Sequence, residues 1–164
     1  MDIIDLTFVQ KRKLFSLPVL LMKEVKHMMV PPYEKSERCN AIMYVDTGSN
    51  LTSITELEAE KLNLNMSALK HIKVGGIGGF IDTPMTSEVK IYLSSSSGYK
   101  LVKLDQISVQ PLELKGKIRR NNGAYKESGM LTTEMVCLFG LDALEKLGGK
   151  LEINMKDKIG KIII

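Results

Sequence analysis

Tryptophan is absent from this 164-residue chain, and aromatic residues make up only 5% of it. Surfaces that stack nucleic-acid bases use aromatic side chains, so this scarcity counts against a nucleic-acid-binding module. Charge of one sign is also scarce, because 23 Lys and Arg stand against 19 Asp and Glu. The one dense basic cluster, at Lys115, Lys117, Arg119 and Arg120, is interpreted as a solvated loop. We expect no nucleic-acid partner.

Cysteine is nearly absent too, with only Cys39 and Cys137, far apart in the sequence. They form no CxxC pair of the kind found in zinc sites and redox motifs, so we expect reduced thiols, no metal, no cofactor and a cytoplasmic location. The apolar stretch at 13–22 is too short to span a bilayer. Pro18 interrupts it and no small-residue cleavage site follows, which argues against a signal peptide. We expect no membrane association.

Long helical patterns are also missing, and most of the chain reads as short apolar segments between turn residues. The length fits a single domain over residues 1–164, and 44% hydrophobic residues allow a core. One core helix is expected in LDALEKLGG, where Leu141, Leu144 and Leu147 recur at helical spacing before a glycine pair. The expected strands are 6–10, 13–22, 40–46, 71–76, 87–94, 99–110 and 135–140.

Three polar stretches, 24–38, 94–98 and 113–129, read as loops on this mostly β framework. The first completes an N-terminal region of strands and loop over 1–38, and the third is interpreted as an inserted loop. Residues 150–164 alternate apolar and polar side chains around KDKIG, which predicts a terminal hairpin. Its last strand, GKIII, can be covered by this hairpin or by a second chain.

The stretch AIMYVDTGSNLTSI, residues 41–54, places Asp46 after an apolar run and before Thr47, Gly48 and Ser49. Glycine permits a tight turn that brings backbone amides to a carboxylate, and the hydroxyls offer further hydrogen bonds. Such a turn orients a catalytic acid. An Asp-Thr-Gly turn is equally consistent with a structural role, in which Asp46 caps the following segment.

Four glycines surround Ile77 in KVGGIGGFIDTP, residues 73–84. They do not fit the G-x-G-x-x-G register of a dinucleotide loop, because Ile81 stands at the last position. They fit the tip of a flexible hairpin whose backbone can approach a ligand closely, although a purely structural glycine hairpin has the same composition.

Taken in order, VDTGS, then GGIGGFI at 75–81, then VCLFGLDALEKLGGKLEI at 136–153 resemble the retroviral-type aspartic proteases, the retropepsins. In that family a strand ends in Asp-Thr-Gly, a glycine-rich flap hairpin follows, and an apolar-apolar-Gly segment precedes one helix. The resemblance implies a retropepsin-like acid protease fold, a closed β-barrel-like domain with one short C-terminal helix and a flap. It leaves 1–38, 113–129 and the last ten residues unmatched.

The resemblance also implies roles for individual residues. Asp46 is similar to the catalytic aspartate, Thr47 to the residue whose hydroxyl contacts the second chain, and Gly48 to the residue that receives substrate backbone. Gly140 is similar to a glycine at which two chain segments cross closely. The substrate-binding positions implied are Ser49, Asn50, Val74, Gly75, Gly76, Ile77, Gly78, Ile81, Val136 and Leu138.

Three positions depart from the family. Asn50 and Leu141 stand where retroviral enzymes have an Asp and an Arg that pair, so both charges are missing together and no unpaired ion is left. Ser49 stands where those enzymes commonly have Ala, and its hydroxyl is expected to donate a hydrogen bond to the Asp46 carboxylate.

Acid-protease chemistry needs two carboxylates, and the chain has no internal repeat to supply the second. Asp82 and Thr83 are followed by Pro84, which cannot form the glycine turn, and Asp142 is interpreted as a structural acid. We therefore expect a homodimer whose twofold axis brings both copies of Asp46 together. Dimers of the family interleave their chain ends in one sheet.

The functional hypothesis is an aspartic endopeptidase acting on extended, apolar-flanked segments of a peptide or protein substrate, with a water activated by the two Asp46 carboxylates. The alternative is a proteolytically silent dimer of the same fold that binds peptides or serves in assembly.

Overall fold

The computed structural model describes residues 1–23, 37–76, 79–117 and 130–164, with the backbone alone at 76, 79–81, 113–117 and 130–133. The helices are α1 Glu56–Lys61 and α2 Leu141–Leu147, with a 3-10 turn at Met66–Ala68. The strands are β1 Ile3–Val9, β2 Leu14–Lys23, β3 Arg38–Val45, β4 Ser53–Thr55, β5 Lys70–Gly76, β6 Gly79–Thr86, β7 Val89–Ser95, β8 Gly98–Lys103, β9 Ile107–Gln110, β10 Glu113–Lys117, β11 Met130–Glu134, β12 Cys137–Phe139, β13 Lys150–Asn154 and β14 Ile159–Ile163.

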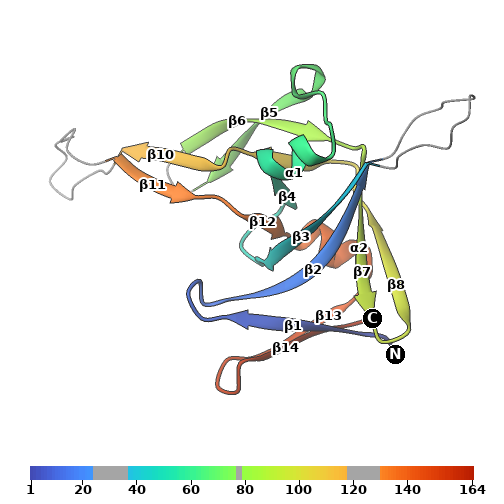
Figure 1. The fold of residues 1–164 in the computed structure, drawn as a ribbon. Helices are drawn as coiled ribbons and strands as arrows, with labels where there is room; N and C mark the ends of the chain where they lie inside the picture. Colours follow the sequence, from blue (N-terminus) through green and yellow to red (C-terminus); the bar gives the residue numbers. More distant parts are fainter. Residues whose placement is uncertain (24–36, 77–78, 118–129) are drawn as a thin grey trace, which may run out of the picture.

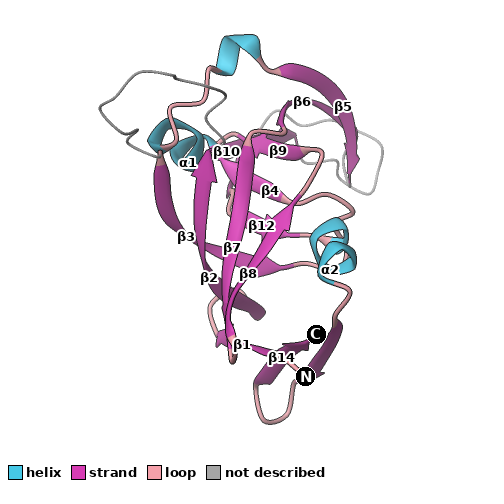
Figure 2. Cartoon of the chain, turned by 90° about the vertical axis from the view of Figure 1, so that its right-hand side faces the viewer, coloured by secondary structure: helices cyan, strands magenta, loops and turns pink. Residues whose placement is uncertain are grey.

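Twelve of these strands form one sheet, and β10 and β11 form a separate ribbon (Figure 1). The order along the large sheet is β13-β14-β1-β2-β3-β12-β4-β9-β6-β5, while β7 pairs with β2 and with β8. Figure 2 shows β2, β3, β7 and β8 standing side by side, with α2 next to them.

The core lies against one face of β2. Phe15, Leu17, Val19 and Leu21 are buried at every second position, as a strand with one face on the core requires. Pro18 between them is exposed, whereas Ser16 is buried as well. Pro18 also falls where β2 changes its neighbour, because residues 14–16 pair with β1 and residues 19–23 pair with β7. Its missing backbone N–H therefore breaks no ladder on that side, which explains a proline in the middle of a strand.

The strands and the C-terminal helix expected from the sequence are present, with shifted bounds. Residues 99–110 are two strands, β8 and β9, rather than one. Helix α2 ends where expected, at Gly148, whose φ of 65° is the left-handed conformation that glycine adopts at low cost. The KDKIG turn joins β13 to β14 as a hairpin.

The expectation of a single helix was wrong, because α1 is a second one. It has only six residues, too few to show a helical period, and a capping box in which Thr55 and Glu58 bond each other's backbone marks its start. The prediction of a loop over 113–129 was also wrong in part, because its first five residues form β10, which pairs with β11. The 94–98 stretch is a tight turn that closes the β7–β8 hairpin.

The expected closed barrel is not shown, because the path of described strands ends at β13 and at β5 without closing. Strands β5 and β6 form an antiparallel hairpin at the expected place. Its tip, Ile77 and Gly78, lies outside the described residues, as do most of the expected 24–38 loop and residues 118–129 of the inserted loop.

The two ends of the chain lie together (Figure 1). Asp2 and Ile164 exchange two backbone hydrogen bonds of 2.8 Å, and β14 lies between β1 and β13. The Asp2 carboxylate accepts hydrogen bonds from Ser96 and Ser97 and pairs with Lys100 at 2.5 Å. Lys100 and then Ser97 hold the pKa of Asp2 well below its usual range. The terminal GKIII segment is thus covered within its own chain, on both edges.

Candidate active site

Asp46 follows the buried end of β3 and sits in a turn that fixes both its backbone and its carboxylate. Its N–H donates to the carbonyl of Phe139 on β12 at 3.1 Å. The Gly48 N–H donates to Asp46 Oδ1 at 2.9 Å, and the Ser49 N–H donates to the Asp46 carbonyl at 3.2 Å. A Cβ at Gly48 would lie 3.2 Å from that same Oδ1. The glycine therefore lets the amide approach the carboxylate without a side chain crowding it.

A second chain segment crosses directly behind this turn at Gly140. A Cβ there would lie 2.6 Å from the carbonyl carbon of Leu51 and 2.9 Å from the nitrogen of Thr52, so no larger residue fits. The Gly140 N–H donates to Thr52 Oγ1 at 3.1 Å, and the Leu141 N–H donates to the Ser49 carbonyl at 2.9 Å. The close crossing expected at Gly140 is confirmed.

Asp142, in the first turn of α2, holds this crossing together. Its carboxylate accepts the Thr52 N–H at 3.1 Å and the Thr52 hydroxyl at 2.6 Å. It also accepts the Ala143 N–H at 2.8 Å. Thr52 is fully buried, so these bonds satisfy polar groups that water cannot reach. The interpretation of Asp142 as a structural acid is confirmed.

The Ser49 hydroxyl does not donate a hydrogen bond to the Asp46 carboxylate, contrary to expectation. It donates to the carbonyl of Leu51 at 2.7 Å. A hydroxyl has one hydrogen to donate, so this bond leaves none for the carboxylate. The amide of Gly48 is the donor to Asp46 instead. Ser49 thus stabilises the loop between the turn and β4.

A pocket of about 540 Å³ opens over the turn, between it and β5. Its lining includes seven of the site residues expected from the sequence, Asp46, Gly48, Ser49, Asn50, Val74, Gly75 and Leu138. Three others were missed, Leu51, Ile72 and Lys73. Ile72 had a usable signal, because it lies two residues before Val74 and so shares its face of β5. No feature of the sequence singled out Leu51 or Lys73.

The remaining expected residues are not among those lining this pocket. Thr47 is exposed, and Val136 is half-buried just before β12. Gly76 ends β5, and the side chain of Ile81 on β6 is not described. The roles given to them, and to Ile77 and Gly78, stay predictions.

Within the described part of the chain, Asp46 is the only carboxylate that lines the pocket. Asp82 is exposed on β6, where its Oδ2 lies 3.1 Å from Nδ1 of His71. No described group of three or more His, Cys, Asp or Glu side chains is arranged to hold a metal ion. The described residues therefore supply a single carboxylate to this pocket.

A buried carboxylate supports β12 from behind. Glu58 accepts hydrogen bonds from the Thr55 hydroxyl and from Cys137 Sγ, the latter at 3.2 Å. Burial raises the pKa of Glu58, but the bonds from Thr55 and Cys137 outweigh it and leave the pKa below its ordinary value. Burial, with help from Glu58, raises the pKa of the Cys137 thiol to about 12. Cys137 is therefore a packing residue and not a nucleophile.

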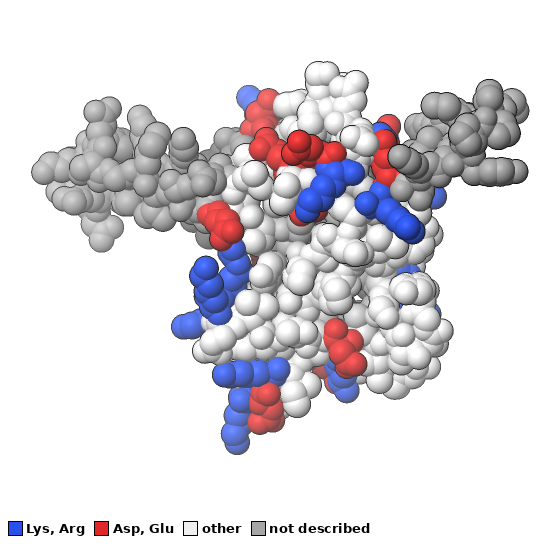
Figure 3. All heavy atoms as spheres, viewed as in Figure 1, with Lys and Arg blue, Asp and Glu red and all other residues white. Residues whose placement is uncertain are grey.

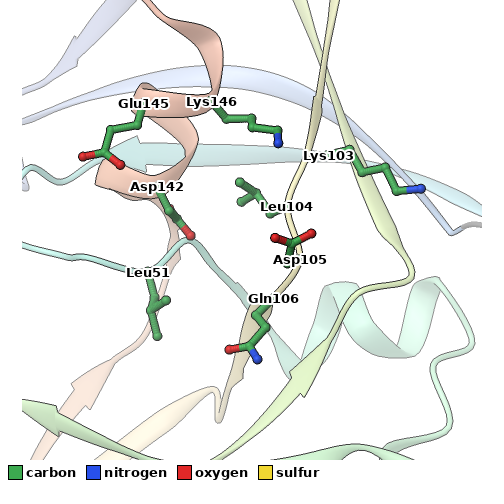
Figure 4. Close-up of a pocket in the computed structure, with 8 residues that line it drawn as sticks. All are labelled: Leu51, Lys103, Leu104, Asp105, Gln106, Asp142, Glu145 and Lys146. Atoms are coloured by element: carbon green, nitrogen blue, oxygen red, sulfur yellow. The ribbon is translucent and has the colours of Figure 1, made fainter.

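A separate hollow of about 590 Å³ lies between α2 and the 103–106 segment (Figure 4). Charges of both signs line it, and Glu145 and Lys146 point in different directions. Two of its members, Leu51 and Asp142, belong to the crossing at Gly140, and the Asp142 carboxylate is already bonded to Thr52. Across the face drawn in Figure 3, acidic and basic side chains are interspersed. None of the described helices has both the length and the apolar character needed to cross a membrane.

No family model and no curated protein sequence matches the chain. A solved structure does match, that of a retropepsin-like aspartic protease from Rickettsia conorii, with a TM-score of 0.53. The match covers 99% of this chain and 91% of that one. At 15% sequence identity it shows a similar fold and nothing more. The chain therefore has the mostly β fold of a retropepsin-like aspartic protease, with two short helices.

Proposed function

We propose that the chain is an aspartic endopeptidase that works as a homodimer. The observation that carries the proposal is one carboxylate, Asp46, oriented by the Gly48 amide at 2.9 Å and opening into a pocket beside a β-hairpin. The retropepsin-like fold supports the same assignment.

The second carboxylate comes from a second copy of the chain. Asp142 is bonded to Thr52, and Asp82 is paired with His71 outside the pocket, so neither is available. A twofold axis next to Asp46 repeats every contact and brings the twin carboxylate face to face with the first. Two carboxylates at that distance do not both ionise comfortably, so the pair keeps one proton.

That shared proton gives the two groups different tasks. The ionised carboxylate takes a proton from a water molecule, whose oxygen attacks the carbon of the scissile amide. The protonated carboxylate donates its proton to the carbonyl oxygen as the tetrahedral intermediate forms. When the carbon–nitrogen bond breaks, the carboxylic acid gives its proton to the leaving amine while the other carboxylate takes a proton from a hydroxyl of the intermediate, so that the pair again holds one proton.

The pocket fits an extended, apolar peptide. Ile72, Val74 and Leu138 supply apolar surface around the single acid, and β5 supplies backbone along one side. An extended segment can bond such a backbone while alternate side chains enter apolar subsites. We propose that the β5–β6 hairpin closes over the substrate as a flap, which excludes water from the reacting bond.

Cleavage of a peptide library by the purified chain tests the proposal, with solution mass measured in parallel. Asp46→Asn is expected to abolish hydrolysis and keep the dimer, because the amide has nearly the shape of the carboxylate but cannot take up or release the shared proton. Asp105→Asn, an exposed acid outside the pocket, is the matched control and should leave cleavage unchanged. Undiminished cleavage by Asp46→Asn would sink the assignment.

A silent dimer of the same fold is the alternative, and Asn50 is the observation that favours it. This residue lines the pocket without a charge, and Leu141, whose N–H donates to the Ser49 carbonyl, carries none either. A statine-type transition-state mimic separates the two possibilities, because it engages the pair of acids directly. Cleavage that the mimic blocks favours the enzyme, whereas peptide binding without cleavage favours the silent module.

A further inference from the structure

One face of the large sheet points away from the core. Strands β3, β2, β7 and β8 are neighbours in that sheet, and alternate residues of each, such as Leu21 and Ile91, are buried in the core. The residues between them face outwards, because successive side chains of a strand point to opposite sides. Figure 2 looks onto this outer side, with β7 and β8 in front of β4 and β12. We call it the outer face: the even-numbered residues of 18–22, 38–42 and 90–94 and the odd-numbered residues of 99–103.

The middle row of the outer face is mostly apolar. Leu20 of β2 lies between Asn40 of β3 and Tyr92 of β7. Leu101 of β8 continues the row opposite Tyr92, and it is 50% exposed.

A second apolar row lies two residues further along the strands. Pro18 of β2 lies opposite Ile42 of β3, and Tyr99 of β8 lies opposite Ser94 of β7. Ile42 is 56% exposed and Tyr99 is 78% exposed. The water-facing side of an antiparallel sheet is normally polar, and contiguous exposed apolar residues mark an interaction surface.

The row on the other side of Leu20 is basic. Met22 of β2 lies between Arg38 of β3 and Lys90 of β7. Lys103 of β8 lies opposite Lys90. None of these four strands contains an Asp or a Glu. The strands therefore give the outer face positive charge at one end and no negative charge of their own.

A hollow of about 590 Å³ lies over the two apolar rows. Within the described part of the chain, Glu58 of α1 is the one acid that lines it. The Glu58 carboxylate already accepts hydrogen bonds from Thr55 and Cys137. The remaining lining is polar only at Asn40 and Ser94 and in the tyrosine hydroxyls, so the hollow suits apolar side chains.

The shape of the outer face selects a helix as its occupant. The apolar side chains are on the face of the sheet and not along an edge, so a partner has to satisfy its own backbone groups, as a helix does. Four strands span about 14 Å, which accommodates one helix of about 10 Å diameter. Two strand residues rise about 7 Å and four helix residues rise about 6 Å. Apolar residues at i, i+3 and i+4, followed by acidic residues at i+7 and i+8, therefore match the two apolar rows and the basic row.

We propose that the outer face is a docking site for an amphipathic helix of another protein, one that carries acidic residues directly after its apolar stripe. Charge complementarity with the basic row supports the acidic end, and the two apolar rows support the stripe. The inference goes beyond the proposed function, because it uses no residue that lines the Asp46 pocket.

Fluorescence anisotropy of a labelled peptide with this pattern tests the proposal on the full chain. The peptide has leucine at the three apolar positions, glutamate at the two acidic ones and about 18 residues, enough to form a helix alone. Ile42→Ser combined with Leu101→Ser should raise the dissociation constant at least about tenfold, because it removes apolar contact without adding charge. Met155→Ser combined with Ile159→Ser is the matched control, since these residues are 56% and 61% exposed on the β13–β14 hairpin. It should leave the dissociation constant unchanged.

A charge exchange tests the basic row separately. A peptide with lysine in place of both glutamates should bind the parent at least about tenfold more weakly. Arg38→Glu combined with Lys103→Glu should reverse this preference, because the attractive pairs become repulsive and the repulsive pairs attractive. Circular dichroism confirms that each variant is folded.

The other occupants are outcomes that overturn the proposal. They are tighter binding of a single-stranded oligonucleotide or of vesicles made of equal parts phosphatidylserine and phosphatidylcholine, and a sedimented mass that falls in the Ile42→Ser, Leu101→Ser variant, which would mean that a second copy covers the face. A parent that does not bind the glutamate peptide overturns it as well. None of these results depends on peptide cleavage, which the same variant should retain, so the proposed function stands or falls separately.

Discussion

The dipeptide Asp-Thr occurs twice in the chain, and its two copies have opposite environments. Asp46 is half-buried at the pocket, and Thr47 beside it is exposed. In the second copy Asp82 is exposed and Thr83 is buried. The first copy lies in a turn after β3, whereas the second lies inside β6, opposite Lys73 and Ile72 of β5.

The third residue accounts for the difference. Gly48 lets the chain turn so tightly that its amide bonds the preceding carboxylate. Pro84 has no amide hydrogen to offer, and it disfavours a helical or turn conformation at Thr83, so the chain stays extended. The comparison teaches that a carboxylate becomes a candidate catalyst through the backbone that surrounds it.

Removing each carboxylate in turn gives the largest contrast. Asp46→Ala should lower peptide cleavage by about a thousandfold or more, since it removes the general acid and base together. Asp82→Ala should leave the rate within about twofold, because an exposed side chain outside the pocket takes no part. Initial rates at saturating substrate measure both.

Pro84→Gly sharpens this test. It recreates Asp-Thr-Gly at 82–84 within the chain that lacks Asp46, and it should restore no activity because β6 keeps those residues extended. Restored cleavage would show that the tripeptide alone specifies the site.

The next largest effect is expected at the Gly140 crossing, and it is a loss of stability. Gly140→Ala should lower the free energy of unfolding by about 3 kcal/mol, the upper end for an overpacked core, because the atoms in the way are backbone atoms of Leu51 and Thr52. Gly48→Ala is the graded control, since its nearest obstacle is a side-chain oxygen that can rotate away. Denaturant unfolding measures both variants. Equal losses would mean that the crossing is no tighter than the turn.

The features that could be predicted from the sequence are those fixed by neighbouring residues. The strand that leads into Asp46, the turn at Gly48, the helix from Leu141 to Leu147 and its end at Gly148 all follow from local rules of glycine placement and side-chain period. The close crossing at Gly140 was foreseen only through the resemblance, since nothing near it in the sequence indicates what it meets.

The features that escaped prediction depend on partners far along the chain or on short elements. Thr52 meets Asp142 across 90 positions, and no local rule pairs them. From the sequence, the Ser49 hydroxyl could donate to the Asp46 carboxylate or to a nearby carbonyl. Only the folded loop shows that it donates to the carbonyl of Leu51. Helix α1 and strand β4 are too short to show a period, and the pairing of β14 with β1 joins opposite ends of the chain.

Asp142 extends the comparison to a third carboxylate, one that serves structure alone. Asp142→Ala should lower the free energy of unfolding by about 2 kcal/mol, because it leaves the buried N–H and hydroxyl of Thr52 without their acceptor. Glu145→Ala, on the exposed side of the same helix, should change it by less than about 0.5 kcal/mol. Equal effects would contradict the role assigned to the Thr52 bonds.

The smallest effect is expected where a carboxylate pairs at the surface. Asp82→Asn removes the contact with His71, whose side chain is 46% exposed while that of Asp82 is 66% exposed. Exposed pairs contribute between about 0 and 1 kcal/mol and weaken with salt, so the free energy of unfolding should fall by less than 1 kcal/mol. Denaturant unfolding at low and high salt measures the difference, which should shrink as salt rises. A loss as large as that of Asp142→Ala, or one insensitive to salt, would mean that the β5–β6 hairpin depends on this pair. The two Asp-Thr copies would then differ in the structure that each carboxylate stabilises, as well as in the backbone conformation around it.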